Sequence, residues 1–99
     1  MLGLETRLTR NAQVPWRLIE GEAILLDGVE GELIRLNQVG AEIWDAIDGT
    51  RTVQEIVDRI CAAFDVSQRR AMRDVHRFLR HLLRHELVEE CLGVSTESA

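Results

Sequence analysis

Basic side chains recur along residues 69–85 at spacings that could recognise an acidic partner. Four arginines stand four, three and four residues apart, which places them on one side of a helix: Arg73, Arg77, Arg80 and Arg84. Guanidinium groups bind carboxylates and phosphates. The same row lies opposite the apolar positions of the stretch, as on an ordinary solvent-exposed helix face, so both interpretations stay open.

Histidine and cysteine form no convincing metal or catalytic pattern. His81 and His85 are one helical turn apart, but Cys91 alone stands near them as a third ligand. No Ser/His/Asp set, glycine-rich phosphate loop or pair of carboxylates stands out. We therefore predict that the protein is not an enzyme and holds no metal or cofactor. Cys61 and Cys91 lie far apart, which is typical of unlinked thiols in a reducing compartment.

The charge is distributed unevenly along the chain. The 99 residues include 12 basic and 17 acidic side chains, a net charge of −5. Residues 69–85 hold six arginines and one acid, Asp74, so this segment carries +5 and leaves −10 elsewhere. The overall acidity argues against a nucleic-acid binder held by net charge.

Length and hydropathy predict one cytoplasmic domain. With 45% hydrophobic residues, 99 residues suffice for one core. No apolar run reaches the about 18 residues of a membrane span, and the N-terminus lacks the apolar segment of a signal peptide. We divide the chain into an N-terminal extension (1–13), a folded domain (14–90) and a flexible tail (91–99).

Three short strands are predicted in the first half of the chain. Runs of branched and aromatic residues bounded by turn signals place them at Val14–Glu20, Ala23–Asp27 and Glu32–Leu36. Pro15 suits the start of an edge strand. A sheet this small needs a helical layer on one face for stability.

Helical segments follow the strands. Asn37 is a suitable cap for a first helix, which we expect to end at Gly49. Thr52 and Glu55 form a capping box for a second helix. Ser67 caps a third and longer one.

The order of elements predicts an α+β, winged-helix-like fold, in which a three-stranded antiparallel sheet precedes three helices. The third helix is expected over Gln68–His85, and "LVEE" at 87–90 adds a short extended piece. The strand Glu32–Leu36 has no later strand beside it. Because proteins usually protect such an edge, an open one indicates a partner that pairs with it.

Several short motifs in this order resemble the PqqD-like family, the peptide chaperones of pyrroloquinoline quinone biosynthesis, and the related RiPP recognition elements. The motifs are "LN" at 36–37, "GAEIW" at 40–44, "DG" at 48–49, "TVQEIV" at 52–57, Phe64, "DVHRFL" at 74–79 and "ELVE" at 86–89. The resemblance covers about three quarters of the chain.

The resemblance implies a non-catalytic module that binds the leader of a ribosomally synthesised precursor peptide. In this family the leader adds as a strand to the third strand, in the groove between that strand and the third helix. The protein then presents the precursor to a modifying enzyme, often a radical S-adenosylmethionine enzyme, or to a leader peptidase. The expected partners are therefore a peptide and an enzyme, with no nucleic acid and no membrane.

The predicted peptide contacts come from the third strand and one flank of the third helix. On the strand they are Glu32, Leu33, Ile34, Arg35 and Leu36. Since groove residues should combine apolar and basic character, the flank is predicted to be Met72, Arg73, His76, Arg80 and Leu83, rather than the one marked by Asp74, Phe78, His81 and His85. Ile34→Pro is expected to abolish binding, because proline lacks a ladder donor.

Two alternatives stay open. The same order of elements and the basic third helix also suit a winged-helix DNA-binding protein, whose affinity would fall steeply with salt. The open strand edge could instead pair with a second copy of the chain, giving a homodimer through sheet extension or strand exchange.

Overall fold

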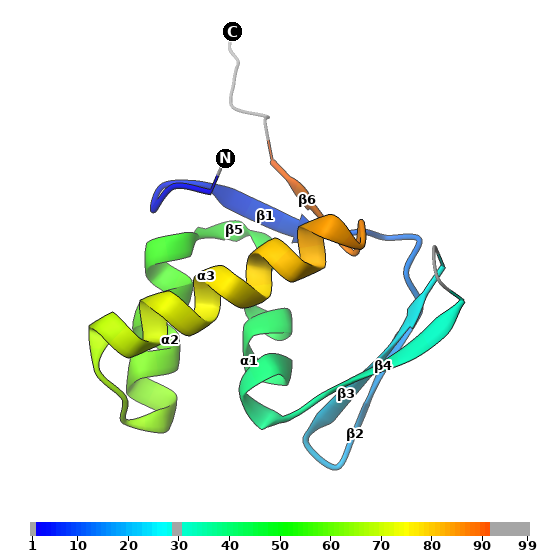
Figure 1. The fold of residues 1–99 in the computed structure, drawn as a ribbon, viewed down its shortest axis with the longest axis horizontal. Helices are drawn as coiled ribbons and strands as arrows, with labels where there is room; N and C mark the ends of the chain where they lie inside the picture. The colour runs from blue at the N-terminus through cyan, green and yellow to red at the C-terminus, as the bar shows by residue number, and fades with distance from the viewer. Residues whose placement is uncertain (1, 29–30, 92–99) are drawn as a thin grey trace, which may run out of the picture.

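The computed structural model describes residues 2–28 and 31–91, and this part of the chain folds into two small sheets and three helices (Figure 1). The elements in chain order are β1 (Arg7–Arg10), β2 (Trp16–Ile19), β3 (Glu22–Asp27), β4 (Glu32–Leu36), α1 (Gln38–Ala46), β5 (Asp48–Thr52), α2 (Val53–Phe64), α3 (Gln68–Arg84) and β6 (Val88–Glu90). The predicted α+β class, with a three-stranded antiparallel sheet and three helices, is confirmed.

The predicted meander forms one sheet with the strand order β2-β3-β4. β4 has the predicted bounds, whereas β2 begins at Trp16 rather than Val14. One face of the sheet is buried through Ala23, Leu25 and Leu36. The neighbouring residues along the strands point to the opposite face, as the alternation of a strand requires.

A second sheet with the order β5-β1-β6 was not predicted. β6 is the extended piece expected at 87–90, but β1 contains a single apolar residue, Leu8, and β5 contains none. Neither strand therefore shows the alternation that reveals strands in a sequence. The segment 1–13, predicted as an extension, contains β1, and Leu8 is 1% exposed. Apart from Cys91, the predicted flexible tail lies outside the described residues.

The three helices begin at the predicted caps. The side chain of Asn37 accepts a hydrogen bond from the Gly40 N–H, and Thr52 and Glu55 form the reciprocal capping box of α2. Ser67 caps α3 in the same way. The predicted end of the first helix is wrong: α1 ends at Ala46, and Gly49 lies within β5 with a φ of 90°. Glycine suits that left-handed conformation without steric cost, so it serves the strand instead of the helix.

Trp44 lies at the centre of the core and is fully buried. The half-exposed ring of Trp16 meets it edge to face, with ring centroids 5.9 Å apart. The Arg10 guanidinium lies 5.3 Å from the Trp16 ring and donates a hydrogen bond to the Trp44 carbonyl at 2.9 Å. Arg10 thereby joins β1 to α1. Among the described residues, none of the helices has the length and apolarity to cross a membrane.

Candidate functional site

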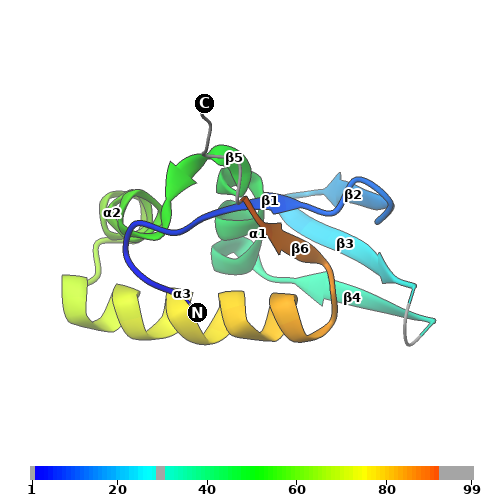
Figure 2. The same ribbon diagram turned by 90° about the horizontal axis from the view of Figure 1, so that it is seen from above.

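β4 forms an edge of its sheet and lies on the side nearest α3 (Figure 2). β3 pairs with one side of β4 along its whole length, from Ala23 opposite Leu36 to Asp27 opposite Glu32. Within residues 2–28 and 31–91, no strand pairs with the other side. The open edge predicted for Glu32–Leu36 is therefore present, and α3 runs beside it.

The hydrogen bonds of β3 show which of its residues bond to β4. The Leu26 N–H donates to the Pro15 carbonyl at 3.0 Å, so the backbone groups of Leu26 point toward the β2 side. Successive residues of a strand direct their N–H and C=O groups to opposite sides. The backbone groups of Leu25 therefore point toward β4, where Leu25 lies opposite Ile34.

The same alternation identifies the groups at the open edge of β4. Because Ile34 bonds to Leu25 inside the sheet, its neighbours Leu33 and Arg35 direct their N–H and C=O groups outward. The Leu33 side chain is 73% exposed. Leu33 and Arg35 thus each offer one backbone N–H donor and one C=O acceptor to an added strand.

An apolar hollow of about 380 Å³ lies between the end of β4, α1 and α3. It is lined by Arg35, Leu36, Asn37, Val39, Gly40, Ile43, Asp74 and Phe78. Gly40 permits this close packing, because a Cβ atom there would meet the Leu36 Cβ at 3.2 Å and the Phe78 Cζ at 3.5 Å. Arg35, one of the two residues with outward backbone groups, is among the residues that line the hollow.

The groove between β4 and α3 has a direction and a length. Asp74 and Phe78 lie beside the end of β4, and His85 is bonded to Asp27, which lies opposite the first residue of β4. α3 therefore runs antiparallel to β4. Five strand residues span about 14 Å and the helix from Asp74 to His85 about 16 Å, so the β4 edge is long enough to pair with about four or five residues of an added strand.

A side-chain hydrogen bond joins α3 to β3 beside the first residue of β4. The Asp27 carboxylate is 1% exposed and lies 2.8 Å from His85 Nδ1, which ties the end of α3 to the end of β3. The rings of His81 and His85 are adjacent, with centroids 4.5 Å apart. Among the described residues no group of three or more His, Cys, Asp and Glu side chains is arranged to hold a metal. Cys61 and Cys91 are free thiols, as predicted.

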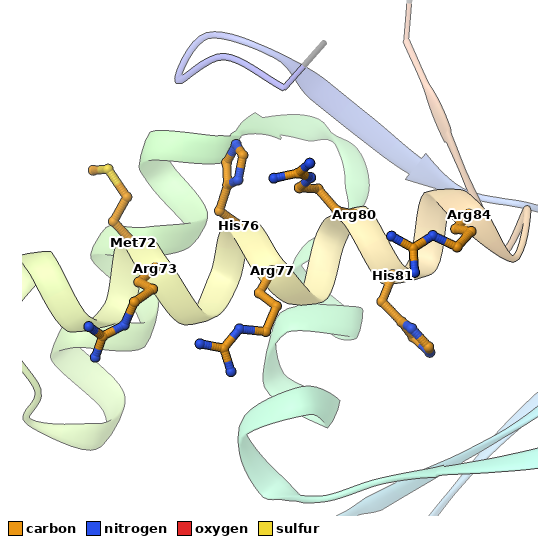
Figure 3. A pocket seen from close by; sticks show the side chains of 7 residues that line it. All are labelled: Met72, Arg73, His76, Arg77, Arg80, His81 and Arg84. Atoms are coloured by element: carbon orange, nitrogen blue, oxygen red, sulfur yellow. The ribbon is translucent and has the colours of Figure 1, made fainter.

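The outward face of α3 is strongly basic (Figure 3). A shallow hollow of about 690 Å³ there is lined by Met72, Arg73, His76, Arg77, Arg80, His81 and Arg84. Arg70 pairs with Asp74 at 3.8 Å. In the described part of the chain, the other arginines of this helix form no ion pair.

The structure places the predicted peptide contacts on α3 away from those predicted on β4. Met72, His76 and Arg80 point toward the side of β1, whereas Arg77 and His81 point toward the side of α1 (Figure 3). His76 Nε2 lies 3.3 Å from the Leu2 carbonyl oxygen. A hollow of about 640 Å³ on this flank is lined by Leu2, His76, Arg80, Leu83, Arg84 and Glu90.

The flank that faces β4 is accordingly the one marked by Asp74, Phe78, His81 and His85. Arg73 lies on the outward face. The strand residues Glu32 to Leu36 lie at the open edge as expected, but the structure does not bring Met72, His76 and Leu83 to it. Phe78 and His85 belong to the flank that was not predicted from the sequence to contact the peptide.

The sequence of the chain places it in the PqqD family. The family model described as "Coenzyme PQQ synthesis protein D (PqqD)" matches residues 22–88, so the chain belongs to this family and the resemblance is confirmed. No curated protein matches the chain in sequence. The solved structure of TbiB1 in complex with the TbiA(beta) leader peptide is similar, with 34% sequence identity and a TM-score of 0.73. The similarity covers 82% of this chain and 94% of that one.

Proposed function

We propose that this protein is a leader-peptide-binding module, a RiPP recognition element, that captures a ribosomally synthesised precursor and presents it to a modifying enzyme or leader peptidase. The leader adds as a strand to the open edge of β4 and fills the groove beside α3. The observation that carries the proposal is this open edge next to an apolar hollow. It is supported by membership of the PqqD family and by the similarity to TbiB1, which binds a leader peptide.

Main-chain hydrogen bonds would hold the leader in register. Leu33 and Arg35 each direct one N–H and one C=O to the open edge, so an added strand gains up to four hydrogen bonds with β4. Each contributes about 0.5–1.5 kcal/mol net. Such bonds are insensitive to side chains, and they account for affinity better than for choice of sequence.

Selectivity would come from the apolar hollow. Leu36, Val39, Ile43 and Phe78 line it, and an apolar leader side chain placed there would lose its contact with water. Full burial of one large apolar side chain contributes about 1.5–3 kcal/mol. The proposed contacts on α3 are Phe78 and its neighbours Asp74, His81 and His85, in place of the opposite flank predicted from sequence. The role is one of binding and assigns the chain no chemical step.

An NMR titration tests the site. The ¹⁵N-labelled protein is mixed with the leader half of a candidate precursor peptide, and we expect amide shifts at Leu33 and Arg35 and around Phe78. Shifts confined to the flank of Met72 and His76 would contradict the proposal.

A pair of proline variants tests strand addition directly. Arg35→Pro removes a donor at the open edge of β4 and should weaken leader binding at least about fivefold. Leu18→Pro is the matched control, because the same alternation directs the backbone groups of Leu18 outward from β2, at the opposite edge of the sheet. Its affinity should equal that of the wild type. Equal loss in both variants would count against β4 as the docking edge.

A second candidate function is DNA binding, favoured by the arginines on the outward face of α3. It predicts duplex affinity that falls steeply as salt rises. Strand addition with an apolar anchor predicts weak salt dependence instead. Titrations of a DNA duplex and of a leader peptide at two salt concentrations distinguish the two functions.

The open edge could also pair with a second copy of the chain. β2 and β4 are both edges of the sheet in the described residues, so sheet extension or strand exchange would give a homodimer. Light scattering over a concentration series measures this. A dimer that dissociates when the leader is added would place self-pairing and leader binding on the same edge.

A further inference from the structure

We propose that the α3 wall of the groove selects leaders that carry a carboxylate, held by Arg77 and His81, close to the apolar anchor. This inference rests on the proposed function and adds the chemical class of the peptide segment that the groove accepts. It is carried by the charges that face the groove and by the spacing along it.

Apart from Glu32, the other charged groups around the groove have partners within the described residues. On α3, Asp74 pairs with Arg70 at 3.8 Å and His85 with Asp27 at 2.8 Å. On β4, the Arg35 guanidinium lies 3.6 Å from the Glu22 carboxylate.

The acids of α1 point elsewhere. Glu42 and Asp45 bind the Arg59 guanidinium at 2.6 and 3.1 Å, so they do not neutralise the groove.

Three groups near the groove keep an unmatched charge or donor within the described residues. Arg77 and His81 extend from α3 toward the side of α1 (Figure 3). Arginine stays charged at every physiological pH, and imidazole offers an N–H donor in both of its protonation states. The exposed Glu32 is the third, and it lies at the far end of β4. The middle of the groove wall is therefore positive, and a leader carboxylate complements it.

Spacing defines where that carboxylate should stand. The strands of this sheet are antiparallel, and a leader added to β4 in the same way would run in the direction of α3. Side chains two residues apart on a strand share a face and are about 6.8 Å apart. His81 lies three residues after Phe78, about 4.5 Å further along the helix axis, and Arg77 lies about 1.5 Å before Phe78. An acid two residues after the apolar anchor would therefore lie about 2 Å beyond the level of His81 and about 8 Å beyond that of Arg77, so His81 would be its nearest contact and Arg77 would reach it through its long side chain.

A displayed library of random 15-residue peptides provides the probe. Three proteins are used for selection: the wild type, Arg77→Glu, and Arg80→Glu as the control. Arg80 has the same charge and lies one turn away on the same helix, but it points toward the side of β1 (Figure 3). Circular dichroism and a backbone-amide NMR spectrum of the peptide-free protein establish that each variant is folded before selection.

We expect wild-type selections to be enriched in Asp or Glu two residues after an apolar residue. Arg77→Glu should lose this enrichment and favour Lys or Arg at that position, while Arg80→Glu should select the wild-type pattern. For one selected acidic peptide, affinity should fall about tenfold in Arg77→Glu and remain within twofold in Arg80→Glu. When the acid of this peptide is changed to Lys, its affinity for the Arg77→Glu variant should be restored.

Two outcomes overturn the inference and leave the proposed function standing. One is a set of peptides that show no enrichment in acids but still bind at the β4 edge, as judged by weaker binding to the Arg35→Pro variant. The other is equal loss in both charge variants, which would show a general field instead of a specific contact. Failure to select any peptide that depends on Arg35 would overturn the proposed function itself. Binding to a DNA duplex that depends equally on Arg77 and Arg80 would do the same in favour of nucleic acid.

Discussion

Replacing Gly40 with alanine tests whether the apolar hollow receives the leader. An added Cβ would lie 3.2 Å from the Leu36 Cβ, 3.5 Å from the Asn37 Oδ1 and 3.5 Å from the Phe78 Cζ. These separations are at or below the optimal 3.5–4.0 Å of carbon contacts, so Leu36 must shift by a few tenths of an ångström. The methyl group would also occupy the floor of the hollow.

The magnitude follows from two opposing effects on the folded state. Alanine in place of glycine in a helix gains about 1 kcal/mol. Crowding in a packed region costs about 1–3 kcal/mol. We therefore expect Gly40→Ala to lower the free energy of unfolding by about 0–2 kcal/mol. Leader affinity should fall further, by about tenfold, because the anchor side chain loses part of its space.

The assay combines urea denaturation, for stability, with calorimetric titration of a leader peptide, for affinity. Gly3→Ala is the matched control, since its Cβ would meet only the Thr6 Oγ1, at an ordinary 3.7 Å and far from the groove. Both its stability and its affinity should stay near the wild-type values. Wild-type affinity in a folded Gly40→Ala variant would refute the assignment of the hollow as the anchor site.

Three further predictions concern the elements that support the groove. Ile34→Pro should destabilise the fold by about 3 kcal/mol, because it removes a hydrogen bond inside the sheet; a urea midpoint like that of Arg35→Pro would contradict the assigned register. Thr52→Ala should cost about 1–2 kcal/mol in urea denaturation, since it breaks the capping box of α2, and no loss would show that water replaces the cap. The hydrogen bonds from the Thr50 side chain and backbone, together with the nearby Arg51, lower the pKa of Asp48 to about 2 from 3.8. Because this pKa is lower in the folded state, the stabilisation is present above about pH 4 and is lost as the pH falls toward 2. The effect of Asp48→Ala should thus be at most about 0.5–1 kcal/mol at pH 7, owing to solvent exposure, and should vanish near pH 2 in pH-dependent urea melts.

The elements predicted correctly are those with a strong local signal. Strands β3 and β4 have apolar residues between turn signals, and the three helix caps are short polar motifs that act within four residues. Such signals depend on neighbours in the chain, so a sequence reveals them. The helix end predicted at Gly49 was wrong because a glycine with a positive φ suits both a helix end and an irregular strand.

The second sheet depends on pairing between distant segments. β1 pairs with β5 and β6, which lie more than 35 residues later, and backbone hydrogen bonds hold the sheet together with a single buried side chain, Leu8, from β1. Backbone pairing leaves little trace in residue type. No local pattern therefore indicated that residues 1–13 contain a strand with a buried side chain.

The flank of α3 that faces β4 could not be identified from the sequence for the same reason. A helical wheel separates the two flanks but does not show which neighbour covers each one. In the structure, the segment before β1 contacts the flank of His76 through the Leu2 carbonyl, and α1 and β4 lie on the flank of Phe78. The apolar and basic residues that suggested a groove at Met72 and Leu83 instead lie beside the N-terminal segment.

This division of α3 explains how one helix can have both a basic face and a specific groove. The N-terminal segment takes up part of one flank, the core takes the buried stripe, and the outward arginines remain in solvent. On the flank of Phe78, the structure combines an apolar hollow with the outward backbone groups of β4, and Arg77 and His81, which have no ion-pair partner among the described residues, point toward the same side. General charge attraction can act over the whole outward face, but it is screened by salt within about 8–10 Å. A peptide that gains strand pairing, apolar burial and a charge contact together would do so on that flank, and the proposed function therefore assigns both affinity and selectivity to the β4 edge.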